Sequence, residues 1–190
     1  MTAQRIVVAL DAGTPARDLD AAVALAGRTG AELLGLFVED IELIRFAALP
    51  FAREIGAASA ARRELDVASV ERALRALANE AERLLAGAAG RSSVPWSFRV
   101  ARGMLVDVLL AAAAEPPAAD PGEEIRLLLL GGGVSPAERW AERARAGFAG
   151  RDPAPRVRVE HAASARDLAQ MTLEFSAPLL IVPARMLRQT

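Results

Sequence analysis

The sequence contains no cysteine, no tyrosine and no lysine, and its single histidine is His161. Without cysteine there is no disulfide framework, no thiol nucleophile and no cysteine-based metal site. Without lysine there is no phosphate-binding loop of the kind whose lysine contacts the β- and γ-phosphates, and no Schiff-base chemistry. A zinc site built from several histidines is excluded, and a Ser-His-Asp triad would need His161. Because these absences exclude most catalytic machinery, we expect that the chain is not an enzyme.

The net charge and the short apolar runs exclude two further classes of partner. The 190 residues carry a formal net charge of −1, so we expect neither a nucleic acid nor an anionic membrane surface as a partner. No apolar run reaches the ~20 residues that span a bilayer. The first residues lead directly into a predicted strand, without a signal peptide. We therefore expect a single domain over residues 1–190, located in the cytoplasm.

Two short apolar runs end abruptly in small or acidic residues. Residues 6–10 stop at Asp11, Ala12 and Gly13, and residues 127–130 stop at three consecutive glycines. Continuous apolar runs of this length are typical of strands buried on both faces. Each run is followed by a turn and by a proline that suits the first turn of a helix. Open α/β sheets bind ligands at the carboxyl ends of such strands, and free N–H groups at a helix start suit an anion.

The rest of the chain alternates between the two periodicities of strands and helices. Strands are predicted at residues 5–10, 33–38, 96–100, 127–130, 157–159 and 179–182, and helices at 15–30, 62–88, 104–114, 136–148 and 165–175. Strand–helix–strand units with short connections form parallel pairs with right-handed crossovers. The alternation of residues 96–100 is typical of a strand near a sheet edge. The sequence thus predicts a three-layer α/β/α fold with an open, mainly parallel sheet of five to six strands.

Three segments are interpreted as elaborations of this fold. Residues 41–60 are dense in large apolar side chains interrupted by Pro50, and we expect one or two short helices there that form a flap near the strand ends. The flap either fills the core beneath a loop or acts as a lid or a partner surface, and filling the core is the simpler interpretation. Residues 116–124 and 150–155 contain several prolines and polar residues, so we predict surface loops.

His161 and two acidic pairs are further candidates for chemistry. His161 follows Glu160 at the end of a predicted strand, a common position for catalytic groups in α/β folds. No nucleophile stands in a defined relation to it, so a structural or solvated histidine is the simpler interpretation. The acidic residues at 39–40 and 123–124 could hold a divalent cation, although adjacent acids on turns are usually solvated.

The order of these pieces resembles the universal stress protein family. In that family the first strand ends in Asp, as here at Asp11, and the second has a valine near its end, as here at Val38. A strand that runs into a glycine is similar to residues 100–103, and a very apolar fourth strand that stops at glycine is similar to residues 127–131. The last strand ends in a Val-Pro-like pair, as residues 182–183 do. The resemblance spans most of the chain and implies an α/β fold like that of the adenine nucleotide alpha hydrolases.

The resemblance also implies a place for an adenine nucleotide, ATP or AMP with Mg²⁺. In nucleotide-binding members a glycine-rich segment follows the fourth strand, because a Cβ would keep the phosphates from the backbone N–H groups. Here Gly131 fits the first position, whereas Val134 and Phe148 depart from the pattern. By resemblance, Asp11 would hydrogen-bond the adenine or the ribose, and the backbone of Val38 would face the base. The phosphate side would be lined by Gly131, Gly132, Gly133 and Ser135.

Three functions remain open at this point. The first is a regulatory stress-response protein without a catalytic site, which acts through dimerisation and protein partners. The second is an adenine-nucleotide binding module at the carboxyl ends of strands one and four, although Asp11 and Thr14 also suit a simple turn and helix cap. The third is an enzyme of the wider nucleotide-binding α/β group. The altered glycine segment argues against the second and the missing residue types against the third, so we predict the first, with no certain cofactor.

Dimerisation is predicted through the last strand. In the family this strand commonly pairs across a two-fold axis, and residues 179–182 would form an exposed apolar edge if left unpaired. Residues 157–159 could instead cover that edge within the same chain, which would exclude this mode of dimerisation.

Overall fold

A computed structural model of the chain describes residues 5–11, 14–55, 62–113, 124–130, 156–170 and 179–183, together with positions 142 and 146. The elements in chain order are β1 (Arg5–Leu10), α1 (Ala16–Thr29), β2 (Glu32–Asp40), α2 (Ile41–Ala47), β3 (Arg53–Ile55), β4 (Arg62–Glu64), α3 (Val67–Gly90), β5 (Trp96–Gly103), α4 (Leu105–Ala113), β6 (Glu124–Leu130), β7 (Arg156–Ala162), α6 (Ala165–Gln170) and β8 (Leu179–Pro183). The predicted helix at 136–148 is described only at positions 142 and 146. The predicted helix beyond residue 170, the predicted loop at 150–155 and the predicted loop at 116–124, apart from Glu124 of β6, lie outside the described ranges.

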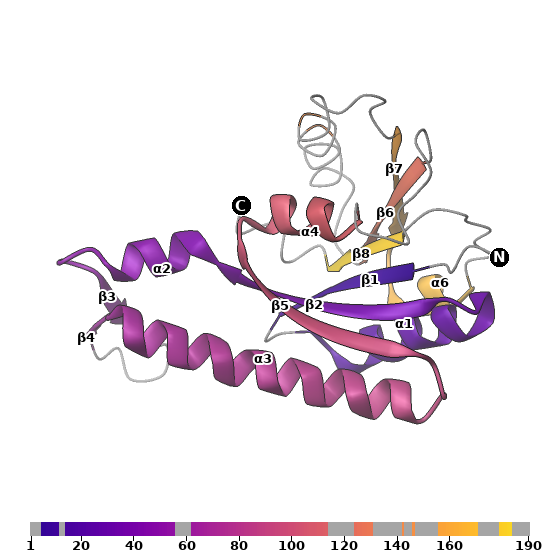
Figure 1. Cartoon of the computed structure of the whole chain (residues 1–190), viewed down its shortest axis with the longest axis horizontal. Coiled ribbons are helices and arrows are strands. Elements are labelled where there is room, and N and C mark those ends of the chain that lie inside the picture. The colour runs from indigo at the N-terminus through magenta and orange to yellow at the C-terminus, as the bar shows by residue number, and fades with distance from the viewer. Residues whose placement is uncertain are drawn as a thin grey trace.

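One sheet of six strands runs through the molecule in the order β5-β2-β1-β8-β6-β7, and each neighbouring pair is parallel (Figure 1). The predicted α/β class is confirmed. Residues 6–10 of β1 are all buried, as expected of a central strand whose two faces are both covered. β5 lies at one edge of the sheet, where its alternating sequence predicts it.

The position of β8 corrects the predicted mode of dimerisation. β8 is an interior strand, because Val8 of β1 pairs with Ile181 on one side and Leu128 of β6 pairs with Ile181 on the other. Its residues 179–182 are buried within the chain, so they do not offer a free edge to a second copy. The edges of this sheet are β5 and β7. An almost wholly apolar strand avoids an exposed edge when it is inserted between two others.

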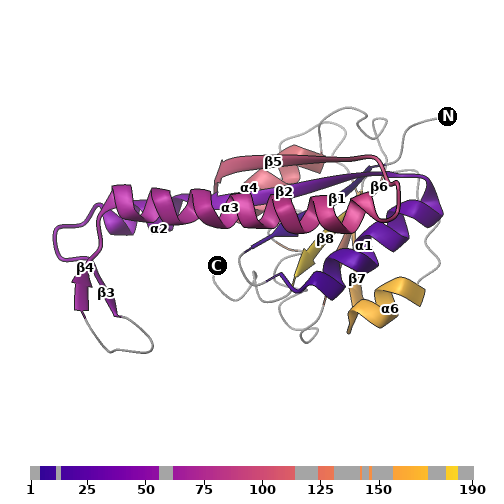
Figure 2. The ribbon, with the colours of Figure 1, turned by 90° about the horizontal axis from the view of Figure 1, so that it is seen from below.

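Helices cover both faces of the sheet. α1 and α3 pack against each other on one face and α6 packs against α1 (Figure 2). α4 contacts β1, β2, β5 and β8 from the opposite face. α1 is followed by Gly30, whose φ of 68° is in the left-handed region that glycine adopts without a Cβ penalty. This is the three-layer arrangement that the sequence predicts.

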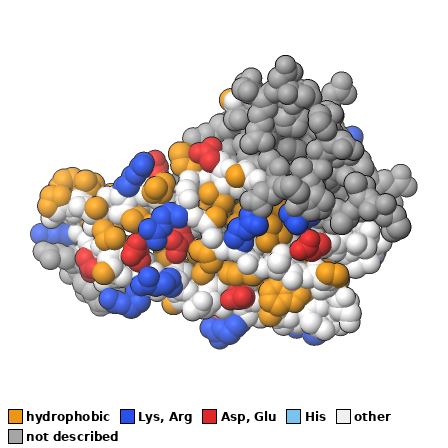
Figure 3. Space-filling model, in the orientation of Figure 1, with side chains coloured by type: hydrophobic (Ala, Val, Ile, Leu, Met, Phe, Trp, Pro, Cys, Tyr) orange, Lys and Arg blue, Asp and Glu red, His pale blue; other side chains and the backbone are white. Residues whose placement is uncertain are grey.

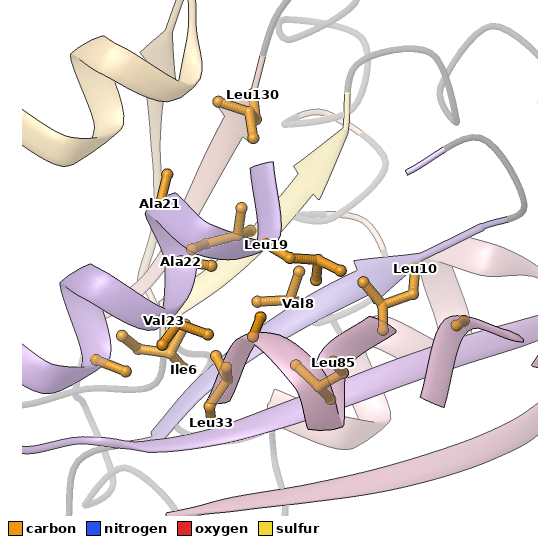
Figure 4. Packing of buried hydrophobic residues seen from close by; sticks show 14 of the residues in the cluster. Ile6, Val8, Leu10, Leu19, Ala21, Ala22, Val23, Leu33, Leu85 and Leu130 are labelled. Carbon is orange, nitrogen blue, oxygen red and sulfur yellow. The ribbon is translucent and has the colours of Figure 1, made fainter. Parts of the chain in front are cut away.

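The main apolar core lies between the sheet and the helices α1 and α3 (Figure 4). Its labelled residues include Ile6, Val8, Leu10, Leu19, Ala22, Val23, Leu33 and Leu85. Gly35 of β2 allows α3 to approach the sheet closely. A Cβ at this position would collide with the Cδ2 atom of Leu85 and would lie 3.1 Å from the Cδ1 atom of Leu10. The close packing of α3 on β2 therefore depends on a residue without a side chain.

The segment predicted as a flap forms part of an arm that extends beyond the sheet (Figures 1 and 2). We define the arm as α2, the antiparallel ribbon of β3 and β4, and the N-terminal half of α3. α2 packs on α3, and the backbone N–H of Leu65 donates to the carbonyl of Ala52 at 3.1 Å where the ribbon joins α3. Ala47 and Ala52 are buried there. The predicted short helix is present as α2, while the ribbon was not predicted.

The start of α3 also differs from the sequence prediction. The helix was expected from residue 62, but residues 62–64 form β4 and the helix begins at Val67. Asp66 is its N-cap: one carboxylate oxygen accepts from the N–H of Ser69 at 2.9 Å, and the other accepts from the Ser69 hydroxyl at 2.6 Å. A residue that satisfies the free N–H groups of the first turn sets the start of a helix more firmly than apolar periodicity does.

Candidate functional site

Two of the residues predicted to bind a nucleotide lie at the same level of the sheet. Asp11 directly follows the last residue of β1, and Val38 is near the end of β2. Leu10 pairs with Phe37 in the parallel register, so the next residue of each strand, Asp11 and Val38, lies at neighbouring strand positions. Val38 is partly exposed. The structure thus brings together one predicted side chain and one predicted backbone contact at the carboxyl edge.

The Asp11 side chain is held in a local turn. The N–H of Thr14 donates to the Asp11 carbonyl at 3.2 Å and the N–H of Asp11 donates to Thr14 Oγ1 at 3.0 Å. The Thr14 hydroxyl in turn donates to Asp11 Oδ1 at 2.8 Å. Thr14 is only 7% exposed. These bonds orient the Asp11 carboxylate and engage one of its oxygens, which agrees with the interpretation of this segment as a turn that leads into a helix.

The phosphate-side residues predicted by resemblance, Gly131, Gly132, Gly133 and Ser135, lie outside the residues that the structure describes. The strand before them is described. β6 is not the neighbour of β1, because β8 lies between the two. At the usual spacing between strands, the ends of β1 and β6 are about 10 Å apart. The end of β8, at Val182 and Pro183, therefore lies between the ends of β1 and β6.

An ion-pair cluster joins the ends of β2 and β5 to the arm. Arg102 of β5 donates from Nε to Glu39 Oε2 at 3.0 Å, and its Nη1 lies 3.0 Å from Glu71 Oε1 on α3. Glu39 is 7% exposed. The hydrogen bond to Glu39, more than any other interaction, raises the pKa of Arg102 above its ordinary value. A buried carboxylate at a strand end thus has a charged partner, and that partner also holds α3.

This cluster was not predicted from the sequence as a unit. Glu39 was considered with Asp40 as a divalent-cation ligand pair, but the two carboxylates have separate structural roles. Asp40 Oδ1 accepts from the N–H of Glu42 at 2.8 Å and caps α2. Among the described ranges no group of three or more His, Asp or Glu side chains is placed to hold a metal ion. The signal that could have found the cluster is an acidic residue, Glu39, that directly follows the buried run of residues 33–37 and the partly exposed Val38, since a buried carboxylate needs a cationic partner.

His161 lies in the edge strand β7, where its backbone is paired with Leu129 of β6. The neighbouring Glu160 has cationic partners. Its Oε1 atom lies 3.3 Å from Arg158 Nε and 3.7 Å from Arg126 Nη1. The Glu160 carboxylate is thus part of an ion-pair group on the strands β6 and β7.

A group of large apolar side chains is exposed on the arm. Leu43 is 42% exposed, Phe46 47%, Leu49 40% and Phe51 71%. We call these four residues the arm patch. The first three follow one another at three-residue steps from α2 into the turn after it, so they lie along one side of the segment. Figure 3 shows hydrophobic side chains gathered at the end of the arm where α2 lies.

No helix within the described ranges is both long enough and apolar enough to cross a membrane.

No family model and no curated protein matches the chain. Solved structures with a similar arrangement include a protein of the universal stress protein family from Burkholderia pseudomallei, with 25% identity over 83% of this chain and 96% of that one, at a TM-score of 0.47. A universal stress protein in complex with cAMP is 19% identical over 85% of this chain and 98% of that one, at a TM-score of 0.43. Both structures come from the family that the sequence resembles.

Proposed function

We propose that this chain is a regulatory stress-response protein of the universal stress protein type, which works in the cytoplasm by binding proteins and not by catalysing a reaction. The observation that carries the proposal is the arm patch. A protein that worked alone would gain from burying two phenylalanines and two leucines, yet the arm holds them on its outer side. Contiguous apolar patches on a polar surface mark interaction sites.

The anchoring of the arm supports the same function. Arg102 connects the sheet with α3 through Glu39 and Glu71, and α2 packs on α3. The arm patch is therefore presented by α2 and the turn after it, and α2 packs on a helix that is attached to a buried part of the sheet. A surface held in place loses less conformational entropy when a partner binds than a mobile loop would.

A second candidate function is the binding of ATP or AMP with Mg²⁺ at the carboxyl edge of the sheet. The placement of Asp11 and Val38 at neighbouring strand positions favours it, because ligands of open α/β sheets bind outside the carboxyl ends of the strands. The engagement of Asp11 Oδ1 by Thr14 and the insertion of β8 beside β1 count against it.

The two functions can be separated by complementation in a strain that lacks the gene. We expect the double variant Phe46→Asp/Phe51→Asp to fail to restore stress survival, and the variant Asp11→Asn to restore it. The control Leu84→Asp introduces one aspartate at an exposed leucine of α3 outside the arm patch (39% exposed) and should also complement. Full complementation by the arm double variant would refute the proposed function. If only Asp11→Asn fails to complement, the result would favour nucleotide binding as the function.

Calorimetric titration with ATP and Mg²⁺ tests the second candidate directly. We expect no heat of binding at millimolar ATP. Micromolar binding that Asp11→Ala abolishes would establish the nucleotide site instead.

A further inference from the structure

We propose that the arm patch is the surface on which a second copy of this chain docks, so that two arms cover each other across a two-fold axis. This inference rests on the proposed function and names the partner of the same surface. It replaces the predicted dimerisation through the last strand. That mode is excluded because β8 lies between β1 and β6 and pairs with both.

The four residues of the arm patch are of a kind and number that suit an interface. Two are phenylalanines, which contribute large contact areas to interfaces, and Phe51 is the most exposed large apolar residue of those described. They come from one short stretch of chain, residues 43–51, between the start of α2 and the start of β3. A hydrophobic centre of this compactness is what partner surfaces bury first.

The area of the patch is close to what a dimer of moderate affinity needs. With side chains of this size exposed to these fractions, the patch presents about 400 Å² of apolar surface. A standard interface buries about 800 Å² on each partner, a little over half of it apolar. The arm patch therefore supplies most of the apolar surface that one partner of such a dimer would bury.

The charges at the border of the patch favour a second copy over a strongly charged partner. Glu42 and Arg45 of α2 and Arg53 of β3 are exposed beside it, so both signs of charge are present. An interface that is related to itself by a two-fold axis must be self-complementary. A border with both signs can place acidic against basic groups of the second copy, whereas a nucleic acid or an acidic protein would need a basic surface.

The inner side of α2 already has contacts within the chain, which leaves the outward side as the one to be covered. On its inner side α2 buries Ala47 and packs Ile44 against the core. The ion pairs of Arg102 attach the other end of the arm to the sheet. The outward face of α2 is thus apolar without a contact that explains it within the described ranges.

The test is sedimentation equilibrium of the purified full chain between 1 and 100 µM, with the wild type compared with Phe46→Asp/Phe51→Asp. We expect a dimer with micromolar affinity for the wild type and at least a tenfold weaker association for the double variant. Leu84→Asp, a single charge introduced outside the arm patch, is the control. It lies about 25 Å along α3 from the start of that helix, and it should dimerise like the wild type. Circular dichroism should show unchanged helix content in both variants.

Three results would overturn the inference: a wild-type monomer at 100 µM, a dimer that Phe46→Asp/Phe51→Asp leaves intact, or a dimer that Leu84→Asp disrupts equally. The proposed function is judged separately by complementation. If the wild type is a monomer and the arm double variant still fails to complement, the arm binds a different protein and only the self-association is wrong. If the double variant complements, the proposed function is wrong, whether the wild type is a monomer or a dimer.

Discussion

The central strands of the sheet and the arm differ in how far their apolar residues are buried. In the sheet, Ile6 and Leu33 are fully buried by strands and helices of the same chain. In the arm, Phe46 is 47% exposed and Phe51 is 71% exposed. Stability alone explains the apolar residues of these central strands, because burial of each large side chain contributes about 1.5–3 kcal/mol. It does not explain those of the arm, and this difference is the main reason for placing the function there.

The largest expected effect compares one truncation in each region. Leu85→Ala removes a fully buried side chain between α3 and the sheet, and we expect a loss of about 2–5 kcal/mol in the free energy of unfolding. Phe51→Ala removes a side chain that is 71% exposed and should change the free energy of unfolding by less than about 0.5 kcal/mol. Urea unfolding at low protein concentration, where the chain is a monomer, measures both. Equal losses would remove the distinction between the two regions.

Gly35→Ala probes the close approach of α3 to the sheet. The new Cβ would collide with Leu85 and crowd Leu10 and Phe98, so we expect a loss of about 1–3 kcal/mol. Because Leu85→Ala removes the nearest atoms, the double variant should be more stable than the sum of the two single losses predicts. Strict additivity in a double-mutant cycle would show that the collision is relieved by other movements.

Thr14→Val tests the turn after β1. The substitution keeps the shape of the side chain and removes the hydroxyl, which accepts a hydrogen bond from the Asp11 N–H and donates one to Asp11 Oδ1. We expect a loss of about 1–2 kcal/mol in the free energy of unfolding, since the site is largely buried. A change close to zero would mean that the turn is held by its backbone alone.

Arg102→Ala tests how the arm is attached. Without the guanidinium, Glu39 and Glu71 lose a shared partner, and we expect faster hydrogen exchange in α2 and in the N-terminal half of α3, with β1 and β2 unchanged. The control Arg91→Ala removes an ion pair between exposed groups, in which Arg91 Nη2 lies 2.6 Å from Asp20 Oδ1. This variant should leave hydrogen exchange in the arm unchanged. Exchange that stays unchanged in Arg102→Ala would show that packing alone positions the arm.

The smallest expected effect is a pH dependence of the arm. The hydrogen bond from the Ser69 hydroxyl, followed by that from its N–H, lowers the pKa of Asp66 below the ordinary value of 3.8. The stabilisation of α3 by this cap is complete above the ordinary value and is lost as the pH falls through the lowered one. The NMR shift of the Ser69 amide should therefore titrate with a midpoint below 3.8, and Asp66→Asn should abolish the step. A midpoint above 3.8 would contradict the observed hydrogen bonds.

The sequence was most informative where local pattern decides structure. Buried strands such as β1 and amphipathic helices such as α1 are set by apolar periodicity, so their class and order were predictable. The insertion of β8 between β1 and β6 was not, because three apolar strands can be ordered in several ways and the order depends on contacts distant in sequence. The ribbon of β3 and β4 was missed for a similar reason, since its strands of three residues carry no clear alternation.

The site was predictable in part. The position of Asp11 after β1 followed from the abrupt end of an apolar run, and the possibility of a turn with Thr14 followed from residue types. The partnership of Arg102 with Glu39 and Glu71 could not be derived, because it joins three elements whose packing the sequence does not encode locally. Residues 41–60 were identified as rich in apolar side chains, but which of them would stay exposed depended on the path of the arm.

Hydrogen exchange of the purified chain at about 1 µM and about 100 µM is the most direct test of the central claim, that two copies of the chain associate through the arm patch. We predict that peptides covering residues 41–51 exchange more slowly at the higher concentration, while the edge strands β5 and β7 exchange equally at both. Concentration-dependent protection at β7, or none anywhere in the chain, would contradict the account.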